Sequence, residues 1–487
     1  MFIKRDEGIA LTFVLISVVL LGIFGTTVMN MTDRSIDFFS RTIDKESSLY
    51  YAEAGYNRYL FFLNQDPYFF ETVKSDNLEN EEKIPFEDGY YKLEITPPAT
   101  GGSVVTVKST GWLPGKEPRT IEVEIARQTF ANWVYGTNKE EIATTGEEIW
   151  WVDGDVVNGP LRTNGNLHIN GDPTFNGTVE FSGTDYLDDD GNPTVDLEPG
   201  SNPNYNKGEP IYKSEPAKFP ETNDNLKNIA QSNGYYFQGR TCIMIDADAQ
   251  EDRQLKIRNQ DGTIQYEPLP PNGVIYVDRI GNYNGKFNYN SGNVFVSGKL
   301  DGRLTIAAKD NIYITGYDPT VWDVNPSNFS EGGTYYTGGI TYADSIDDGQ
   351  SNDMLGLVSE NNIEILHANW PRADSSKYYD NHWDHPSYDY NVAIEDIEIN
   401  ASMFTLDGSF GFERYNEGSE KGTITLRGSV FQNNRGPVGT FNSSTGEKRT
   451  GYDKNYNYDR RLRKYTPPYY VSPENAGWEI LNWRIVN

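Results

Sequence analysis

The 487-residue sequence predicts a mainly β protein with one long N-terminal α-helix, arranged as a small α+β head followed by an irregular parallel β-helix (solenoid). Two observations lead to this prediction. Residues 9–29 form an uncharged apolar run, and beyond residue 65 helical periodicity gives way to short alternating stretches separated by turn residues. The length exceeds that of a single core, so we expect more than one domain.

The apolar run, IALTFVLISVVLLGIFGTTVM, has 21 residues and follows Lys4 and Arg5. About 20 apolar residues span a bilayer, so the run is long enough to cross a membrane. A cleaved secretory signal would have a shorter apolar core followed by a small-x-small site, and no such site follows here. We therefore expect a retained anchor whose helix continues across residues 30–63, where apolar side chains recur at helical spacing.

The short charged leader MFIKRDEG, the apolar run and the downstream AEAG segment at 52–55 resemble the N-terminus of PilX-type minor pilins. The resemblance covers about the first 130 residues. It implies that a prepilin peptidase cleaves after Gly8 and that Ile9 becomes the N-methylated first residue of the mature chain. A plain signal anchor that holds an ectodomain at the surface is the alternative.

Major pilins of this family carry a glutamate at the fifth mature position, where this chain has Phe13. That glutamate is thought to neutralise the N-terminal amine of a neighbouring subunit, since an unpaired charge inside an apolar filament is costly. Because it lacks this glutamate, the chain resembles minor pilins or pseudopilins that initiate or cap a filament.

Residues 89–127 alternate between apolar and polar side chains in three stretches separated by Pro and Gly, which predicts a three-strand meander. A long helix against such a meander is the head arrangement that the resemblance implies. We therefore divide the chain into a leader (1–8), a transmembrane segment (9–29), a pilin-like helix and meander head (30–128) and a β-helix-like surface domain (129–487).

Asn-Gly pairs begin at Asn158, Asn164, Asn170 and Asn176, six residues apart. Asn-Gly accepts positive φ, so each pair could turn a hairpin or form a corner of a parallel coil. Short strands expected at 294–296, 304–306 and 312–314 favour the coil. This later region resembles uncharacterised C-terminal domains attached to PilX-like N-termini, and that resemblance transfers no active site.

Charge and cysteine content exclude some functions. The 42 basic and 71 acidic residues give a net charge of −29, which repels phosphates and makes nucleic acid a poor partner. Cys242 is the one cysteine, so an internal disulfide cannot form.

Three loops contain side chains of the kinds that bind metals. DNHWDHPSYDY offers imidazole and carboxylate groups to a transition metal, whereas DYLDDDGNP and DSIDDG offer the oxygen ligands that calcium prefers. The candidate ligands are His382, Asp384, His385, Asp188, Asp190, Asp344 and Asp348. Neither acidic loop matches the twelve-residue calcium loop. A solvated loop is the preferred interpretation of each, so we expect no cofactor, with calcium as the exception considered.

The sequence therefore predicts a minor pilin-like subunit of a type IV pilus or related secretion filament, which displays its β-helix at the cell surface for adhesion or a tip role. Before assembly it would be a single-pass membrane protein. Expected partners are a prepilin peptidase, other pilin or pseudopilin subunits, the membrane and a surface glycan or protein ligand.

Two other functions are considered. An anchored β-helical enzyme could act on polysaccharide, but Glu395 and Glu398 would point to opposite faces of a strand and no catalytic motif is found, so we predict that the chain is not an enzyme. The second alternative is a binding or scaffold protein of the envelope that never joins a filament.

Overall fold

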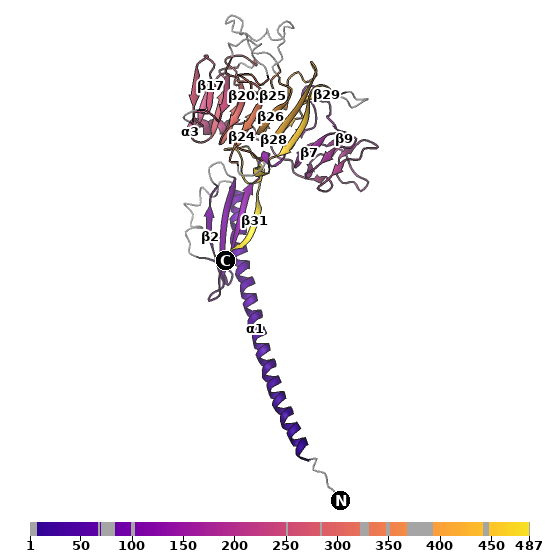
Figure 1. Ribbon diagram of the computed structural model, residues 1–487, viewed down its shortest axis with the longest axis vertical. Helices are drawn as coiled ribbons and strands as arrows, with labels where there is room; N and C mark the ends of the chain where they lie inside the picture. The colour runs from indigo at the N-terminus through magenta and orange to yellow at the C-terminus, as the bar shows by residue number, and fades with distance from the viewer. Residues whose placement is uncertain are drawn as a thin grey trace. The chain divides into compact units, whose positions relative to one another are not determined.

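The computed structural model describes residues 7–66, 69, 83–98, 103–249, 252–282, 285–321, 331–346, 351–367, 393–441 and 448–486 (Figure 1). The chain forms two compact units. The head unit contains Met1–Pro97, Val105–Ala126 and Trp478–Asn487, and the β unit contains Pro98–Val104 and Arg127–Gly477.

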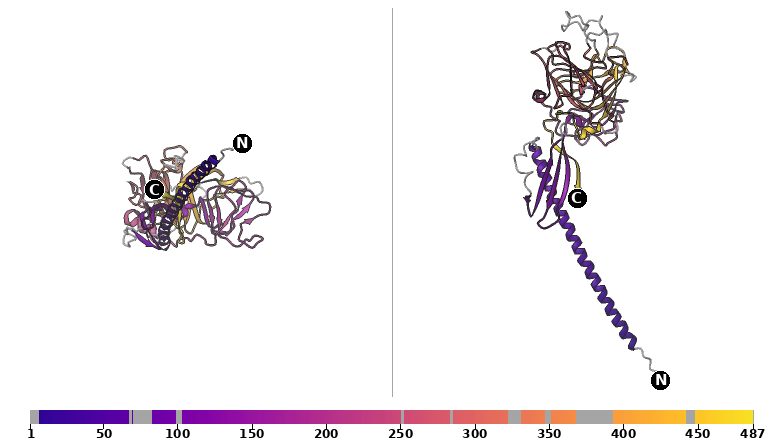
Figure 2. Two further views of the ribbon diagram at one scale, coloured as in Figure 1. Left: turned by 90° about the horizontal axis from the view of Figure 1, so that it is seen from below. Right: turned by 60° about the vertical axis from the view of Figure 1, so that its left-hand side comes forward.

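The head unit begins with α1 (Glu7–Gln65), a helix of 59 residues. At 1.5 Å per residue it is about 90 Å long. Figures 1 and 2 show it as one uninterrupted helix whose C-terminal part lies against a sheet. The long N-terminal helix expected from the sequence is therefore present, and it is continuous from the apolar run into the head.

The head sheet has the strand order β1-β2-β3-β4-β31 among the described residues. The strands are β1 (Ile84–Phe86), β2 (Gly89–Thr96), β3 (Val104–Trp112), β4 (Arg119–Arg127) and β31 (Trp478–Val486). Strands β2, β3 and β4 lie where the meander was expected, and their alternate residues are buried. Side chains at helical spacing cover this face, namely Ala52, Tyr56, Tyr59 and Leu63 of α1.

The last strand differs from the expected domain division, which assigned all of 129–487 to the surface domain. Trp478 is buried in the core of the head unit, and Arg484 Nε donates to Glu122 Oε1 of β4 over 2.9 Å. The segment WEILNWRIV lacks a clear two-residue alternation, and most of its side chains are exposed. Its place in the head sheet depends on contacts with residues more than 350 positions earlier in the sequence.

The β unit is built mainly from short strands that pair in parallel. Its helical segments are α3 (Asp224–Asn233), η1 (Phe130–Asn132) and η5 (Arg460–Arg463). Its strands are β5 (Tyr135–Lys139), β6 (Trp151–Val152), β7 (Val156–Asn158), β8 (Leu161–Thr163), β9 (His168–Asn170), β10 (Thr174–Phe175), β11 (Val179–Phe181), β12 (Asp196–Leu197), β13 (Asn204–Tyr205), β14 (Ile211–Tyr212), β15 (Tyr235–Gln238), β16 (Thr241–Asp246), β17 (Leu255–Arg258), β18 (Ile264–Glu267), β19 (Val274–Asp278), β20 (Val294–Leu300), β21 (Arg303–Ala308), β22 (Ile312–Ile314), β23 (Gly339–Tyr342), β24 (Met354–Ser359), β25 (Ile363–Ile365), β26 (Ile397–Thr405), β27 (Phe410–Phe412), β28 (Glu420–Asn434), β29 (Gly439–Phe441) and β30 (Lys448–Tyr458).

Three neighbouring strand pairs in the early β unit have the same separation in sequence, whereas β5 and β8 are 26 positions apart and β10 and β13 are 30 apart. Strand β6 pairs with β9, β7 with β10 and β8 with β11, all in parallel. The paired residues are 18 positions apart, as 151 and 169, 156 and 174, and 161 and 179. Later partners are farther apart, since Arg303 of β21 pairs with Met354 of β24. The β unit is therefore largely parallel, as the sequence analysis expected.

The Asn-Gly pairs lie between parallel strands, so they are corners and not hairpin turns. Among their glycines, Gly171 has a positive φ of 104°. Gly177 serves a different purpose, because a Cβ atom there would collide with the backbone of Gly159 in the paired segment. Positive φ therefore does not explain all of these glycines. It explains Gly171, whereas close approach of the paired backbone explains Gly177.

The core of the β unit contains a row of aromatic side chains. Trp151 contacts Tyr135 at 5.3 Å and Phe175 at 5.6 Å between ring centroids, and Phe175 stacks on Tyr205 at 5.4 Å. Phe175 and Tyr205 are also direct partners in the parallel pair of β10 and β13, so their stacking supports the same register as the backbone pairing. Cys242 is also buried in this core.

Candidate functional site

The N-terminal part of α1 presents an apolar surface that no described part of the chain covers. Its most apolar 18-residue window has a mean hydropathy of 2.4, and none of that window is buried. By length and composition, the helix could cross a membrane. Soluble chains rarely expose so large an apolar surface, which marks it as a site for lipid or for other apolar helices.

Hydroxyl groups within this segment are satisfied by the helix itself. Thr27 Oγ1 donates to the carbonyl of Ile23 over 2.7 Å, and Thr32 Oγ1 donates to that of Val28 over 2.9 Å. Thr26 also donates to Ile23, over 3.0 Å. Because these donors need no water, the segment can enter an apolar environment without leaving an unpaired hydroxyl.

The expected processing site lies at the start of this helix. Gly8 and Ile9 are within the first turn of α1, which begins at Glu7. Phe13, at the position where the resemblance implies a glutamate, is 67% exposed. The expected cleavage site is therefore at the helix terminus, and Phe13 presents an aromatic ring to the surroundings of the helix.

The candidate metal ligands do not come together among the described residues. His382, Asp384, His385 and Asp348 lie outside those residues. Asp188 is exposed, and its Oδ1 accepts hydrogen bonds from the backbone of Asp190 at 3.0 Å and of Asn192 at 2.8 Å. The hydrogen bond from the Asn192 backbone is the main cause that lowers the pKa of Asp188. The Asp188 carboxylate thus stabilises the turn at 188–192 through hydrogen bonds within it. Asp190 and Asp344 are exposed.

A group of three ligand-type side chains forms elsewhere, at residues that the sequence analysis did not select. One ligand atom each from Glu148, His168 and Asp196 lies within 4.8 Å of the other two. His168 and Asp196 are direct partners on the parallel strands β9 and β12. His168 is 20 positions after Glu148 and 28 positions before Asp196, and these spacings match no metal-binding motif. The signal that could have located the group is the 18-residue register of β6 and β9, which places Trp150 beside His168.

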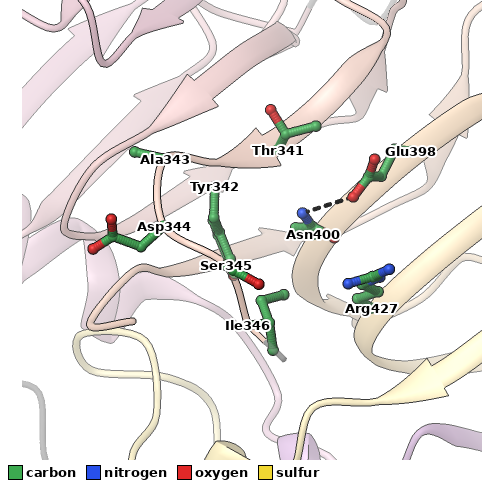
Figure 3. A pocket seen from close by; sticks show the side chains of 9 residues that line it. All are labelled: Thr341, Tyr342, Ala343, Asp344, Ser345, Ile346, Glu398, Asn400 and Arg427. Atoms are coloured by element: carbon green, nitrogen blue, oxygen red, sulfur yellow. Dashed lines mark hydrogen bonds between the residues drawn. The ribbon is translucent and has the colours of Figure 1, made fainter. Parts of the chain in front are cut away.

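A polar pocket of about 330 Å³ lies on the β unit beside β26 and β28. Figure 3 shows Glu398, Asn400 and Arg427 at one side of it, with the carboxylate of Asp344 at the opposite side pointing away from them. Asn400 Nδ2 donates to Glu398 Oε1 over 3.1 Å. Glu395, the other half of the carboxylate pair considered from the sequence, is instead near Lys421 at 3.4 Å. The pocket therefore contains one of those two carboxylates.

A partly buried carboxyl group lies on another part of the β unit. Glu364 is opposite Gly411 in the parallel pair of β25 and β27, and Glu413 follows two residues later on the same face. Burial, and then repulsion from Glu413, raises the pKa of Glu364 to about 7. Glu413 in turn forms an ion pair with Lys286 and accepts from the backbone of His367 over 3.0 Å.

Comparisons with known proteins give limited matches. Residues 91–184 match the model of a Domain of unknown function (DUF4900), which is less than half of the chain. A comparison with curated proteins finds no match. Among solved structures, the chain is similar to the competence-associated pilin ComZ from Thermus thermophilus, with 11% sequence identity, a TM-score of 0.28, and coverage of 90% of this chain and 97% of that one.

Proposed function

We propose that this chain is a minor pilin-like subunit of the PilX type, which enters a type IV pilus or related secretion filament through α1 and displays the β unit at the cell surface. The observation that carries the proposal is the exposed apolar segment, which continues without a break into the helix of the head. Before assembly this segment would anchor the chain in the membrane. Its partners there would be other pilin or pseudopilin helices.

Close packing between α1 and the head sheet supports this role. A Cβ atom on Gly111 of β3 would collide with the backbone of Ala52 and Ser48, and one on Gly55 would be 2.8 Å from the ring of Tyr91. Small residues thus let the helix and sheet approach closely. A helix held so tightly can transmit force between a filament core and its head without relying on a flexible joint.

Processing follows from the same proposal. A prepilin peptidase would cleave after Gly8, and Ile9 would become the methylated first residue. Phe13 offers no carboxylate to the N-terminal amine of a neighbour, so a terminal position that initiates or caps the filament suits this chain better than repeated internal packing.

The shared 18-residue separation of three neighbouring strand pairs supports a further part of the proposal, that this part of the β unit winds as a parallel β-helix. Such a coil presents a regular polar outer face from which loops project. We propose that this face contributes to adhesion or to a tip structure, with a surface glycan or a protein as the ligand.

Isolation of filaments tests the role directly. Surface filaments sheared from native cells and purified should contain this chain, and deletion of the prepilin peptidase should remove it from the filament fraction and leave it in the membrane. The matched variants are Gly8→Leu, which should block entry into filaments, and Asn202→Leu, at an exposed position of the β unit outside α1. Equal amounts of both variants in filaments would contradict the proposal.

One observation favours the enzymatic alternative, namely the carboxyl of Glu364 beside Glu413, since a raised pKa suits a general acid. The absence of enzyme activity remains a prediction. Incubating the purified full chain with a panel of surface polysaccharides would test it: glycan release that is lost in Glu364→Gln would establish the alternative, and no release would count against it.

A further inference from the structure

We propose that Glu148, His168 and Asp196 bind one divalent transition-metal ion, with Zn²⁺ as the preferred ion. This site is independent of the filament role and differs from the acidic loops considered for calcium. His168 Nδ1 lies 2.8 Å from Asp196 Oδ2 and 3.9 Å from Glu148 Oε2. Zinc bonds of about 2.0–2.2 Å at tetrahedral angles separate two ligand atoms by roughly 3.3 Å, so the observed distances lie on either side of that value.

The charges around His168 favour a cation. Neither Glu148 nor Asp196 forms an ion pair with a lysine or arginine among the described residues, and His168 is 4% exposed. A neutral imidazole can donate the Nδ1 proton to one carboxylate at a time, here to Asp196. A divalent ion in place of that proton would be bound by the nitrogen and both carboxylates, and would balance their charge.

The surroundings hold the imidazole in a fixed orientation. The ring of Trp150 lies 5.2 Å from that of His168, and the ring of Tyr186 lies 5.9 Å away at a steep angle. The Tyr186 hydroxyl also forms a hydrogen bond with the Asp196 side chain. A hydroxyl that supports a ligating carboxylate is the kind of outer contact that orients metal ligands.

The position of the site gives the ion a structural role. Strands β6, β9 and β12 form a separate three-stranded sheet of two, three and two residues, shorter than most strands. The chain has one cysteine, so no internal disulfide can reinforce this sheet. An ion that joins β9, β12 and the segment before β6 would do so.

The ligand set identifies the class of metal. One imidazole with two carboxylates suits Zn²⁺ and related first-row ions, whereas calcium and magnesium prefer oxygen ligands alone. Glu148 is exposed and the other two ligands are largely buried, so an ion could enter past Glu148.

Zinc titration of the detergent-solubilised full chain tests the site. The background should carry His382→Ala and His385→Ala, which removes the histidines of the other candidate loop. We expect one equivalent of Zn²⁺ to bind, binding at least roughly tenfold weaker in Glu148→Gln, and unchanged binding in Glu147→Gln, an exposed neighbour. Because Glu148 is exposed, its substitution should not prevent folding.

A second measurement gives a readout of structure. At a zinc concentration that half-saturates the Glu147→Gln chain, zinc should slow hydrogen exchange in β9 and β12 of that chain much more than in the Glu148→Gln chain. The inference is overturned if no zinc binds at micromolar concentration, or if the two variants bind it equally. Either result would leave the filament proposal untouched, since that depends on α1.

Discussion

Asn176 donates a hydrogen bond of 2.8 Å from its Nδ2 to Oδ1 of Asn158, the asparagine one strand partner earlier. The ladder extends in both directions, because Asn206 donates to Asn176 over 2.6 Å and Asn158 donates to Asn457 over 3.1 Å. Each asparagine therefore links two successive segments of the β unit. This gives Asn158 and Asn176 a structural role beyond their tolerance of turns.

Removing one asparagine side chain from this ladder should lower the local stability of the two strands that it links. In Asn176→Ala, the amides of β7 and β10 should exchange hydrogen about fivefold faster, because an exposed side-chain hydrogen bond contributes about 1 kcal/mol. Exchange measured by mass spectrometry on peptides would show this. Asn202→Ala, an exposed residue nearby, is the control. Identical exchange in both variants would mean that the ladder adds no stability.

The contact between α1 and the head sheet depends on the absence of a side chain at Gly55. In Gly55→Val, the added atoms would meet Ser109 and Tyr91, so we expect a loss of about 1–3 kcal/mol in the stability of the head. Gly25→Val is the matched control, since nothing lies within 4 Å of a Cβ there. Thermal unfolding in detergent, followed by protease sensitivity of the head, would separate the two. A head that melts alike in both variants would rule out this close packing.

A buried ion pair holds part of the β unit together. Arg435 Nη1 lies 2.9 Å from Glu140 Oε2, both side chains are 1% exposed, and the guanidinium lies 4.1 Å from the ring centroid of Trp151. Arg435→Met would leave the buried carboxylate unpaired, with an expected cost of about 3–5 kcal/mol. Lys299→Met, which breaks the exposed pair with Asp248, should cost less than about 1 kcal/mol. Urea unfolding of the two variants compares these losses, and similar midpoints would contradict the argument.

The raised pKa of Glu364 makes stability depend on pH. The carboxyl binds its proton more tightly in the folded chain, so its contribution is fully present below the unfolded pKa of about 4.3 and is lost as pH rises through about 7. Glu364→Gln should remove this decrease, which we expect to be about 1–3 kcal/mol. Unfolding midpoints of both proteins at several pH values between these limits measure it. Parallel pH profiles would show that the Glu364 carboxyl does not titrate in this range.

The sequence predicted elements whose signals are local. The apolar run at 9–29, the meander at 89–127 and the Asn-Gly corners depend on neighbouring residues, and each lies in an element of the expected type. The place of β31 could not be predicted, because Trp478 and Arg484 contact residues far away in sequence. The group around His168 was missed for the same reason. Its three side chains are far apart in sequence, and the pairing of β9 with both β6 and β12 brings them together.

Mass spectrometry of the mature N-terminus from native cells tests the central claim most directly. The account predicts that the chain begins at an N-methylated Ile9 when the prepilin peptidase is present, and that it keeps MFIKRDEG when the peptidase gene is deleted. An intact Met1 in cells that contain the peptidase, or cleavage at another bond, would contradict the pilin-like account and favour a simple anchored ectodomain.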